Sequence, residues 1–281
     1  MFLRKRDLPP LLRAIHDPPA RLYLRGEGDA ELLTRPAVAI VGARACSPYG
    51  AQVAGMLGRD LAAAGVVVVS GLARGIDGEA HRGALEARGH TVAVLGCGID
   101  RDYPAAHMSL ARSIAERSLI VSEYEPGVEP APWRFPARNR IIAGLCAATV
   151  VVEARERSGA LITADFALEE GREVFAVPGE ITSVLSAGTN RLLALGASPL
   201  LEADDVLRSF GIDRAEQPPP ADLTEAAAKV LGALGDGAAS VDELMAATGL
   251  GIGTVAAALT ELELAGLATE GDGRYRRVAG R

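Results

Sequence analysis

An arginine-rich segment with two aromatic residues is the part of this sequence best suited to contact nucleic acid. It spans Trp133–Arg140 (WRFPARNR) and holds three arginines within seven residues. Guanidinium groups bind phosphates and aromatic rings stack on bases, which is the combination that single-stranded nucleic-acid sites use. A structural role fits as well, with Phe135 in the core, the arginines paired with nearby acids and Asn139 capping a helix. The pattern alone leaves both interpretations open.

Glycine-rich turns form a second candidate for anion binding. Gly42–Arg44, Ser70–Arg74 and Ser158–Thr163 each follow or precede an apolar run. Glycine lets backbone N–H groups approach a ligand, and the N-termini of following helices attract anions. Several such turns on one sheet edge predict a phosphate-binding shelf, although a single turn could use glycine for steric reasons alone.

Catalytic and cofactor-binding patterns are weak. Gly42–Arg44 lacks the later glycines of a dinucleotide fingerprint and no Walker loop is present, so we expect neither NAD nor ATP, and no other cofactor. Asp77 and His81 form an i, i+4 pair that could act as acid and base, but a helix-capping aspartate beside a structural histidine is the better explanation. Glu153 could polarise a water, or it could anchor turn N–H groups. We therefore expect no catalytic residue.

The cysteines carry no metal or disulfide pattern. They are three in number and lie far apart in the sequence, at Cys46, Cys97 and Cys146. This spacing is typical of reduced thiols in an intracellular protein. We expect no metal site.

Alternating strands and helices must position these groups. The expected strands are Val38–Val41, Val66–Ser70, Thr91–Leu95, Leu119–Ser122, Thr149–Glu153 and Glu173–Val177. The expected helices are Gly50–Ala64, Gly78–Arg88, Ala105–Arg117, Asn139–Cys146, Leu161–Glu170 and Thr189–Leu195. Near-continuous apolar strands separated by helices predict an α/β fold, a Rossmann-like, doubly wound and mostly parallel sheet over residues 36–210. Such a sheet binds ligands at the carboxyl ends of its strands.

The remaining chain divides into three parts. Residues 1–35 read as an N-terminal extension, and residues 211–221, which contain Gln217–Pro220, read as a linker. Residues 222–281 predict a small winged-helix domain, with helices at Glu225–Leu234, Val241–Thr248 and Ile252–Ala265 and a hairpin at Leu267–Val278. The third helix contains two glutamates and no lysine or arginine, which opposes binding in a duplex groove.

Composition restricts the function further. The 281 residues are 49% hydrophobic and 23% charged, which permits a buried core and excludes a wholly disordered chain. The net charge is −7, and residues 1–35, with seven positive and five negative side chains, are the positive part. This charge balance argues against a broad basic surface that binds duplex DNA, so a nucleic-acid site must be a local pocket. Apolar runs such as Val66–Val69 are too short to span a membrane, and we expect a cytoplasmic protein.

Seven ordered motifs resemble the DprA/Smf family of DNA-processing proteins. They are IVGAR (Ile40–Arg44), SGLARGIDGEAH (Ser70–His81), VAVLGCGIDRDYP (Val92–Pro104), FPARNRIIAGL (Phe135–Leu145), SGALIT (Ser158–Thr163), VFAVPG (Val174–Gly179) and GTNRLLALGA (Gly188–Ala197). The resemblance covers residues 10–210, and the tail is similar to the winged helix of many members.

This resemblance implies a non-enzymatic, homodimeric protein that binds single-stranded DNA. Such a protein protects the strand that enters during natural transformation and loads the RecA recombinase onto it. The resemblance makes Arg44 the principal phosphate ligand. It adds contacts from Arg134, Phe135, Arg138, Asn139 and Arg140, and backbone or small polar groups at Gly42, Ser70, Gly71, Ser158, Gly159 and Thr163.

The sequence departs from the family pattern at three places. Ala43 and Ala160 stand where a hydroxyl side chain is expected, the family's N-terminal helical domain is absent or short, and the third helix of the tail is acidic. Each missing hydroxyl removes a hydrogen bond of about 0.5–1.5 kcal/mol, which is too little to abolish binding.

Two other functions stay open at this point. A nucleotide-hydrolysing, phosphoribohydrolase-like enzyme would use the glycine turns and Glu153, but Ser158–Thr163 lacks the second glycine of that group's PGGxGT loop. A winged-helix transcription regulator would need a duplex-reading helix, which the acidic third helix opposes.

Overall fold

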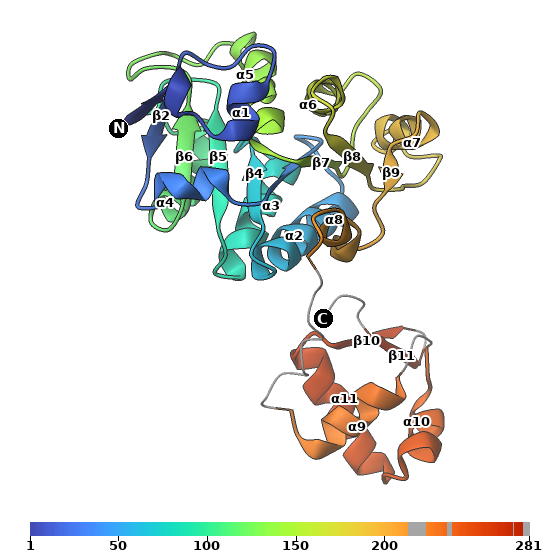
Figure 1. Cartoon of the computed structure of the whole chain (residues 1–281). Coiled ribbons are helices and arrows are strands. Elements are labelled where there is room, and N and C mark those ends of the chain that lie inside the picture. The colour runs from blue at the N-terminus through green and yellow to red at the C-terminus, as the bar shows by residue number, and fades with distance from the viewer. Residues whose placement is uncertain (213–222, 235–237, 272, 278–281) are drawn as a thin grey trace. The chain divides into compact units, whose positions relative to one another are not determined.

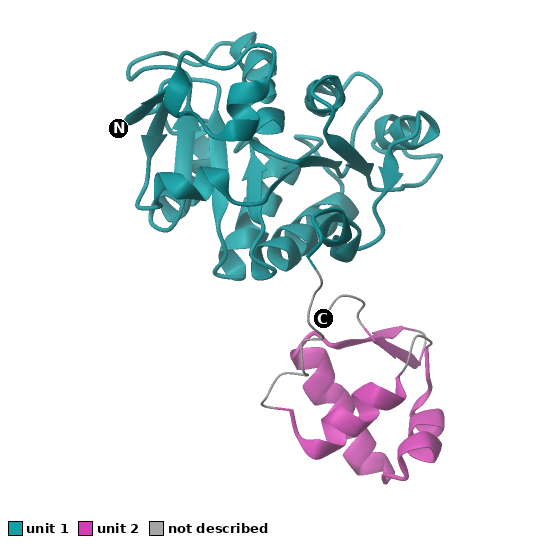
Figure 2. Cartoon of the chain, in the orientation of Figure 1, with its two compact units in different colours: residues 1–213 teal, residues 214–281 magenta. Residues whose placement is uncertain are grey.

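The chain folds into two units (Figure 2), which a computed structural model describes for residues 1–212, 223–234, 238–271 and 273–277. The first unit is Met1–Asp213 and the second is Arg214–Arg281. Most of the expected linker at 211–221, with Gln217–Pro220, lies outside the described residues, as does Val278 of the expected hairpin.

A nine-stranded sheet forms the centre of the first unit as described (Figure 1), in the order β1-β2-β6-β5-β4-β3-β7-β8-β9. The strands are β1 (Phe2–Arg4), β2 (Arg21–Arg25), β3 (Ala37–Val41), β4 (Val67–Ser70), β5 (Thr91–Leu95), β6 (Leu119–Ser122), β7 (Ala148–Val151), β8 (Glu173–Ala176) and β9 (Ser198–Pro199). Neighbours from β6 to β9 are parallel, whereas the β1–β2 and β2–β6 pairs are antiparallel.

Helices cover both faces of this sheet, because the central strands are apolar on both sides. They are α1 (Pro10–Ala14), α2 (Pro48–Ala63), α3 (Ile76–Glu86), α4 (Met108–Ala115), α5 (Arg134–Leu145), α6 (Gly159–Glu169), α7 (Ala187–Ala194) and α8 (Ala203–Ser209). One core lies between the sheet and α1, α5 and α6, and two others lie beneath α2, α3, α4 and α8. The predicted α/β, doubly wound and mostly parallel architecture is confirmed.

Residues 1–35 differ from the expected extension, because they belong to the sheet. β2 pairs antiparallel with β6, and β1 pairs with β2. The sequence of β2, RLYLR, alternates polar and apolar residues, and it buries Leu22 and Leu24 in the main core. This five-residue pattern is too short to identify a strand until its partner, β6, is known.

Several helices begin earlier than the sequence predicts, and two of them, α5 and α6, reach the carboxyl edge of the sheet in this way. α5 begins at Arg134 rather than Asn139, and it holds Pro136 in its first turn, where a missing N–H leaves no hydrogen bond unmade. α6 begins at Gly159 rather than Leu161, with Ser158 as its N-cap. Both helix N-termini therefore reach the carboxyl edge of the sheet.

The second unit is a winged helix with its own core. α9 (Glu225–Ala233), α10 (Val241–Thr248) and α11 (Ile252–Leu264) surround buried residues such as Val230 and Leu259, and β10 (Ala268–Gly271) pairs antiparallel with β11 (Arg274–Arg277). In the described parts of the chain no single helix is long and apolar enough to cross a membrane. Only α10 and α11 taken together meet that length and composition, with a bend of 108° between them.

Candidate nucleic-acid interface

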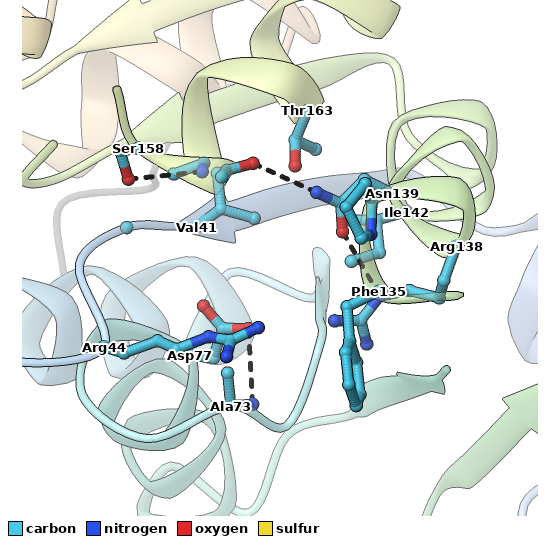
Figure 3. Close-up of a pocket in the computed structure, with 14 residues that line it drawn as sticks. Val41, Arg44, Ala73, Asp77, Phe135, Arg138, Asn139, Ile142, Ser158 and Thr163 are labelled. Carbon is cyan, nitrogen blue, oxygen red and sulfur yellow. Dashed lines mark hydrogen bonds between the residues drawn. The ribbon is translucent and has the colours of Figure 1, made fainter. Parts of the chain in front are cut away.

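Two adjoining hollows lie at the carboxyl edge of the sheet in the first unit. The first has a volume of about 250 Å³ and includes eight predicted site residues in its lining, Gly42, Arg44, Phe135, Arg138, Asn139, Ser158, Gly159 and Thr163. The second has a volume of about 380 Å³ and adds the predicted Gly71. The hollows share Arg44, Ala73, Phe135 and Arg138, so Arg44 and Phe135 stand where they meet. Figure 3 shows the first hollow with Arg44 and Phe135 in its lining.

Arg44 is an exposed cation that lines both hollows. It follows β3 in the turn that leads to α2, and its guanidinium carbon lies 5.4 Å from the centre of the Phe135 ring. No described residue forms an ion pair or hydrogen bond with its guanidinium. Phe135 in turn stacks on Tyr103, with ring centres 5.4 Å apart and planes 24° apart. A free cation beside an aromatic pair can bind a phosphate and stack a base.

Arg138 lies beneath the hollows rather than in the open. It is 4% exposed and donates from Nη1 to the carbonyls of Gly71, at 2.8 Å, and Val94. Burial lowers the pKa of its guanidinium to about 10, while the charge of Asp77 acts in the opposite direction. The group therefore stays cationic at neutral pH and fixes the turn after β4 while it adds positive potential to the site.

The turn after β4 requires glycine at Gly71 and holds a strained residue. A Cβ on Gly71 would lie 2.5 Å from Nη2 of Arg138. Leu72 adopts φ +58°, a left-handed conformation that is costly for a large side chain. The buried carboxylate of Asp77 accepts the N–H groups of Gly71 at 3.1 Å and Ala73 at 3.4 Å, which holds the turn in place. Burial raises the pKa of the Asp77 carboxyl, and the Arg138 guanidinium opposes that rise.

Helix α6 points its N-terminus at the first hollow. The Ser158 hydroxyl accepts the N–H of Ala160 at 3.3 Å, and Asn139 donates from Nδ2 to the carbonyl of Gly159 at 3.1 Å (Figure 3). Thr163, one turn later on the same helix, is buried in the wall of the hollow. The positive end of this helix adds to the attraction of an anion.

The N-terminus of α2, the helix after the turn at Gly42–Arg44, already binds a carboxylate of the protein itself. It is therefore not open to a ligand, which corrects the expectation that the helices after the glycine-rich turns all attract one. Glu153 is 4% exposed and accepts both the backbone N–H and the hydroxyl of Ser47, the N-cap of α2. A Cβ on Gly50 would lie 2.4 Å from this carboxylate. Glu153 therefore anchors a turn, as one of its two sequence interpretations states.

Three predicted site residues lie outside both hollows. Ser70 is fully buried, and its hydroxyl donates to the carbonyl of Ile40 at 2.6 Å. Arg134 lies over the rings of Tyr124 and Trp133, at 5.1 and 4.7 Å from their centres.

Arg140, the third of these residues, forms ion pairs instead of lining the site. It donates from both terminal nitrogens to Glu123 at 2.8 Å and from Nε to Asp17 at 3.0 Å. Of the three arginines in Trp133–Arg140, the structure brings only Arg138 to the hollows.

Asp77 and His81, the candidate acid–base pair, have separate structural roles: Asp77 holds the turn after β4, and His81 contacts Thr91. Nδ1 of His81 lies 2.6 Å from the Thr91 hydroxyl, away from Asp77, and burial lowers the pKa of His81 to about 3. Among the described residues, no group of three or more histidines, cysteines and carboxylates could hold a metal ion.

Sequence reasoning missed several lining residues of the second hollow. Arg74, Gly96, Tyr103 and Pro104 line it. Arg74 and Tyr103 stand within the glycine turns after β4 and β5, so their place next to Arg44 follows once both turns are assigned to one sheet edge. A Cβ on Gly96 would lie 2.8 Å from the Phe135 ring, which places Phe135 over the end of β5.

Sequence comparisons relate both units to one family. The family described as "DNA recombination-mediator protein A" matches residues 1–211, and the "DprA winged helix domain" matches residues 214–274. The chain is 48% identical over 199 residues to the DNA processing protein DprA of Streptococcus pneumoniae, covering 71% of this chain and 70% of that protein. It is 40% identical over 281 residues to protein Smf of Escherichia coli, covering 96% and 75%.

Solved structures give the same result. The X-ray structure of DprA from Streptococcus pneumoniae matches with a TM-score of 0.70 and 44% identity, covering 74% of this chain and 73% of that one. DNA processing protein A from Helicobacter pylori, whose structure was described for its single-stranded DNA binding mode, matches with a TM-score of 0.68 and 32% identity, covering 75% and 95%. The two units match two models of the same family in chain order, and the solved DprA structures share the fold of the first unit. The chain therefore belongs to the DNA recombination-mediator protein A (DprA/Smf) family of DNA-processing proteins.

Proposed function

We propose that the protein binds single-stranded DNA at the two hollows. The observation that carries this proposal is the guanidinium of Arg44, which has no hydrogen-bond or ion-pair partner among the described residues, beside the Phe135–Tyr103 stack at a glycine-rich sheet edge. Arg44 binds a phosphate, Phe135 stacks a base, and Gly42, Asn139, Gly159 and the α6 N-terminus complete the site. Ser70, Arg138 and Arg140 hold the surrounding turns and helix. The single-strand binding mode described for the Helicobacter pylori relative supports the same ligand here.

Within cells, the bound strand is DNA that enters during natural transformation. We propose that the protein, in the cytoplasm, protects this strand from nucleases and loads RecA onto it. Candidates for the contact of the proposed homodimer are the exposed apolar side chains Ile181 (95%), Leu195 (75%) and Leu201 (77%), which follow β8, α7 and β9 in the chain. Exposed apolar side chains of this size are typical of protein–protein contacts.

Equilibrium binding of a labelled oligothymidylate tests the first step. We expect Phe135→Ala to weaken binding by about 1–3 kcal/mol, the usual stacking contribution of one base, and Arg44→Ala to weaken it further. Arg112→Ala, at an exposed arginine on α4 that lines neither hollow, is the control and should bind as the wild type does. Wild-type affinity in both site variants would refute the site.

Nucleation of RecA filaments on oligonucleotides coated with single-strand binding protein tests the second step. The wild type should shorten the lag before filament growth, and Phe135→Ala should not. An unchanged lag with the wild type would refute the loading role but leave DNA binding standing.

The hydrolytic alternative is less well supported, because both carboxylates near the site are engaged. Asp77 accepts N–H groups of the β4 turn, and Glu153 binds Ser47. Release of free base from a nucleoside monophosphate by the purified protein would revive it.

A further inference from the structure

A basic hollow lies at the edge of the sheet formed by β1 and β2. It has a volume of about 470 Å³ and is lined by Phe2, Arg4, Lys5, Arg6, Ala20 and Arg21. Four of these six residues are cationic and none is acidic. We call it the β1–β2 basic hollow.

Two of its arginines oppose each other across the strands without a counterion. Arg4 of β1 stands directly opposite Arg21 of β2. Among the described residues, neither arginine, nor Lys5, forms an ion pair. Like charges at directly opposed positions destabilise a strand pair. A bound anion would remove this repulsion, so the arrangement favours a polyanionic ligand.

Aromatic rings accompany the charge. The Phe2 ring is 41% exposed, lies 5.6 Å from the ring of Tyr23 and carries the Arg21 guanidinium 5.4 Å from its centre. The hydrogen bond with the Tyr23 hydroxyl is the main cause that raises the pKa of Arg21, with a smaller contribution from Glu125. A cation with an exposed ring is the pair that binds phosphate and base in single-stranded nucleic acid.

Sheet register places this hollow on the same edge as the two hollows that share Arg44 and Phe135, which we call the Arg44 site. Tyr23 is opposite Ser122, the last residue of β6, and Arg21 lies two residues beyond it in the direction of the carboxyl ends. From β4 the order runs β5, β6, β2 and β1. With about 4.8 Å between neighbouring strands, the β1–β2 basic hollow is about 19 Å from the centre of the Arg44 site, a distance that a few nucleotides span.

A third cluster lies between the two sites. The Arg134 guanidinium is packed on Tyr124, the second residue after β6, and on Trp133, which is 63% exposed. β6 stands between β5 of the Arg44 site and β2 of the basic hollow. Phosphate- and base-binding groups therefore recur along one edge, at β3–β5, at β6 and at β1–β2.

We propose that single-stranded DNA leaving the Arg44 site continues along the carboxyl edge of the sheet toward β1 and ends in the β1–β2 basic hollow. This inference rests on the proposed function of the Arg44 site. Arg4, Lys5 and Arg21 bind phosphates, and Phe2 stacks a base. The strand then has one direction of exit, past Trp133.

Binding of long and short oligothymidylates to the full chain tests this path. The two lengths, about 4 and about 16 nucleotides, bracket the site sizes of single-strand-binding folds. The variant Arg4→Glu/Arg21→Glu should lose about 20-fold in affinity for the long strand at 0.1 M salt, and its salt slope should fall by about 1.4, the effect of two phosphates. Affinity for the short strand should stay within twofold of the wild type, because its few nucleotides are taken up inside the Arg44 site and only the long strand has further nucleotides to cover the distance of about 19 Å to the hollow.

The matched control is Arg112→Glu/Arg117→Glu, which changes the net charge equally at exposed positions of α4 and the turn after it. A long-strand affinity in Arg4→Glu/Arg21→Glu equal to this control would overturn the path. So would an equal loss for both lengths, which indicates a general charge effect. A loss confined to duplex DNA would assign the hollow to another ligand and would also overturn it.

Trp133 gives a separate readout, because it is the only tryptophan in the chain. Its fluorescence should change when the long strand binds, and unchanged emission would contradict the path past β6. Arg44→Glu distinguishes the two proposals: if both lengths bind this variant as they bind the wild type, the proposed function fails, whatever the result at Arg4 and Arg21.

Discussion

At the scale of single residues, internal bonding decides which cations are free to bind DNA. Arg44 has an exposed guanidinium, Arg138 is buried under carbonyls, and Arg140 is paired with Glu123 and Asp17. Charge-assisted hydrogen bonds inside a protein are stronger than those at its surface. Arg138 and Arg140 therefore hold the surrounding structure, which leaves Arg44 for the proposed contact with DNA.

Gly71→Ala tests how Arg138 is held. The new Cβ would lie 2.5 Å from the Arg138 guanidinium, so the side chain must move and lose its bond to the Gly71 carbonyl. We expect a loss of about 1–3 kcal/mol in stability by urea denaturation, together with weaker binding of oligothymidylate. Gly159→Ala is the control, because its Cβ would meet nothing within 4 Å. Equal stability of the two variants would contradict this packing.

His81 makes stability dependent on pH. Its folded pKa of about 3 lies below the unfolded value of 6.5, so the unfolded chain binds a proton that the folded chain excludes. Stability therefore falls as pH decreases from 6.5, by about 2 kcal/mol between pH 7 and pH 5. In urea denaturation at several pH values, His81→Gln should remove this part of the slope of stability against pH, whereas His16→Gln, at an exposed position, should keep it. The same slope in both variants would contradict the role of His81.

At the scale of elements, the sheet whose carboxyl edge carries the site includes β2, a strand that the sequence did not predict. Leu22 of β2 is fully buried in the main core. We expect Leu22→Ala to destabilise the first unit by about 2–5 kcal/mol in urea denaturation. Leu168→Ala, at a half-exposed position of α6, should change stability by less than about 0.5 kcal/mol. A small effect at Leu22 would show that β1 and β2 are dispensable.

The central strands and the turns of the site could be predicted from sequence, because β-branched runs and the glycines that follow them are local signals. The role proposed for Arg44 came from the family resemblance of its motif, IVGAR, and stays a prediction. Pairing of Arg140 with a nearby acid such as Glu123 was one of the two sequence interpretations, whereas its pairing with Asp17 could not be predicted, since Asp17 is 123 residues away and its approach depends on the finished fold. The start of α5 was missed for a different reason: Pro136 suggests a break in a helix, but it is tolerated in a first turn.

At the scale of the whole molecule, each unit has a separate core and a separate charge pattern. The winged helix carries Glu261 and Glu263 on α11, and Glu261 accepts the N–H and hydroxyl of Thr224. Arg274 on the wing is bonded to Glu243 and to the Ala238 carbonyl. These contacts engage Arg274, whereas Arg276 and Arg277 of β11 are exposed, so the positive charge open to a duplex in the described part of this unit lies mainly on the wing.

Removal of the second unit tests this division of roles. We expect residues 1–212 to bind oligothymidylate within about threefold of the full chain, because every residue of the Arg44 site lies in the first unit. The full chain should show no preference for duplex over single-stranded DNA in a gel shift. A loss of more than tenfold on truncation would place part of the site in the winged helix.

The most direct test of the central claim is the salt dependence of oligothymidylate binding by wild type and Arg44→Glu. If Arg44 binds a phosphate, the slope of log affinity against log salt should be smaller in the variant by at least about 0.7, the value for one phosphate of a single strand. Affinity at low salt should fall with it. An unchanged slope and affinity would show that the guanidinium at the sheet edge does not touch the DNA.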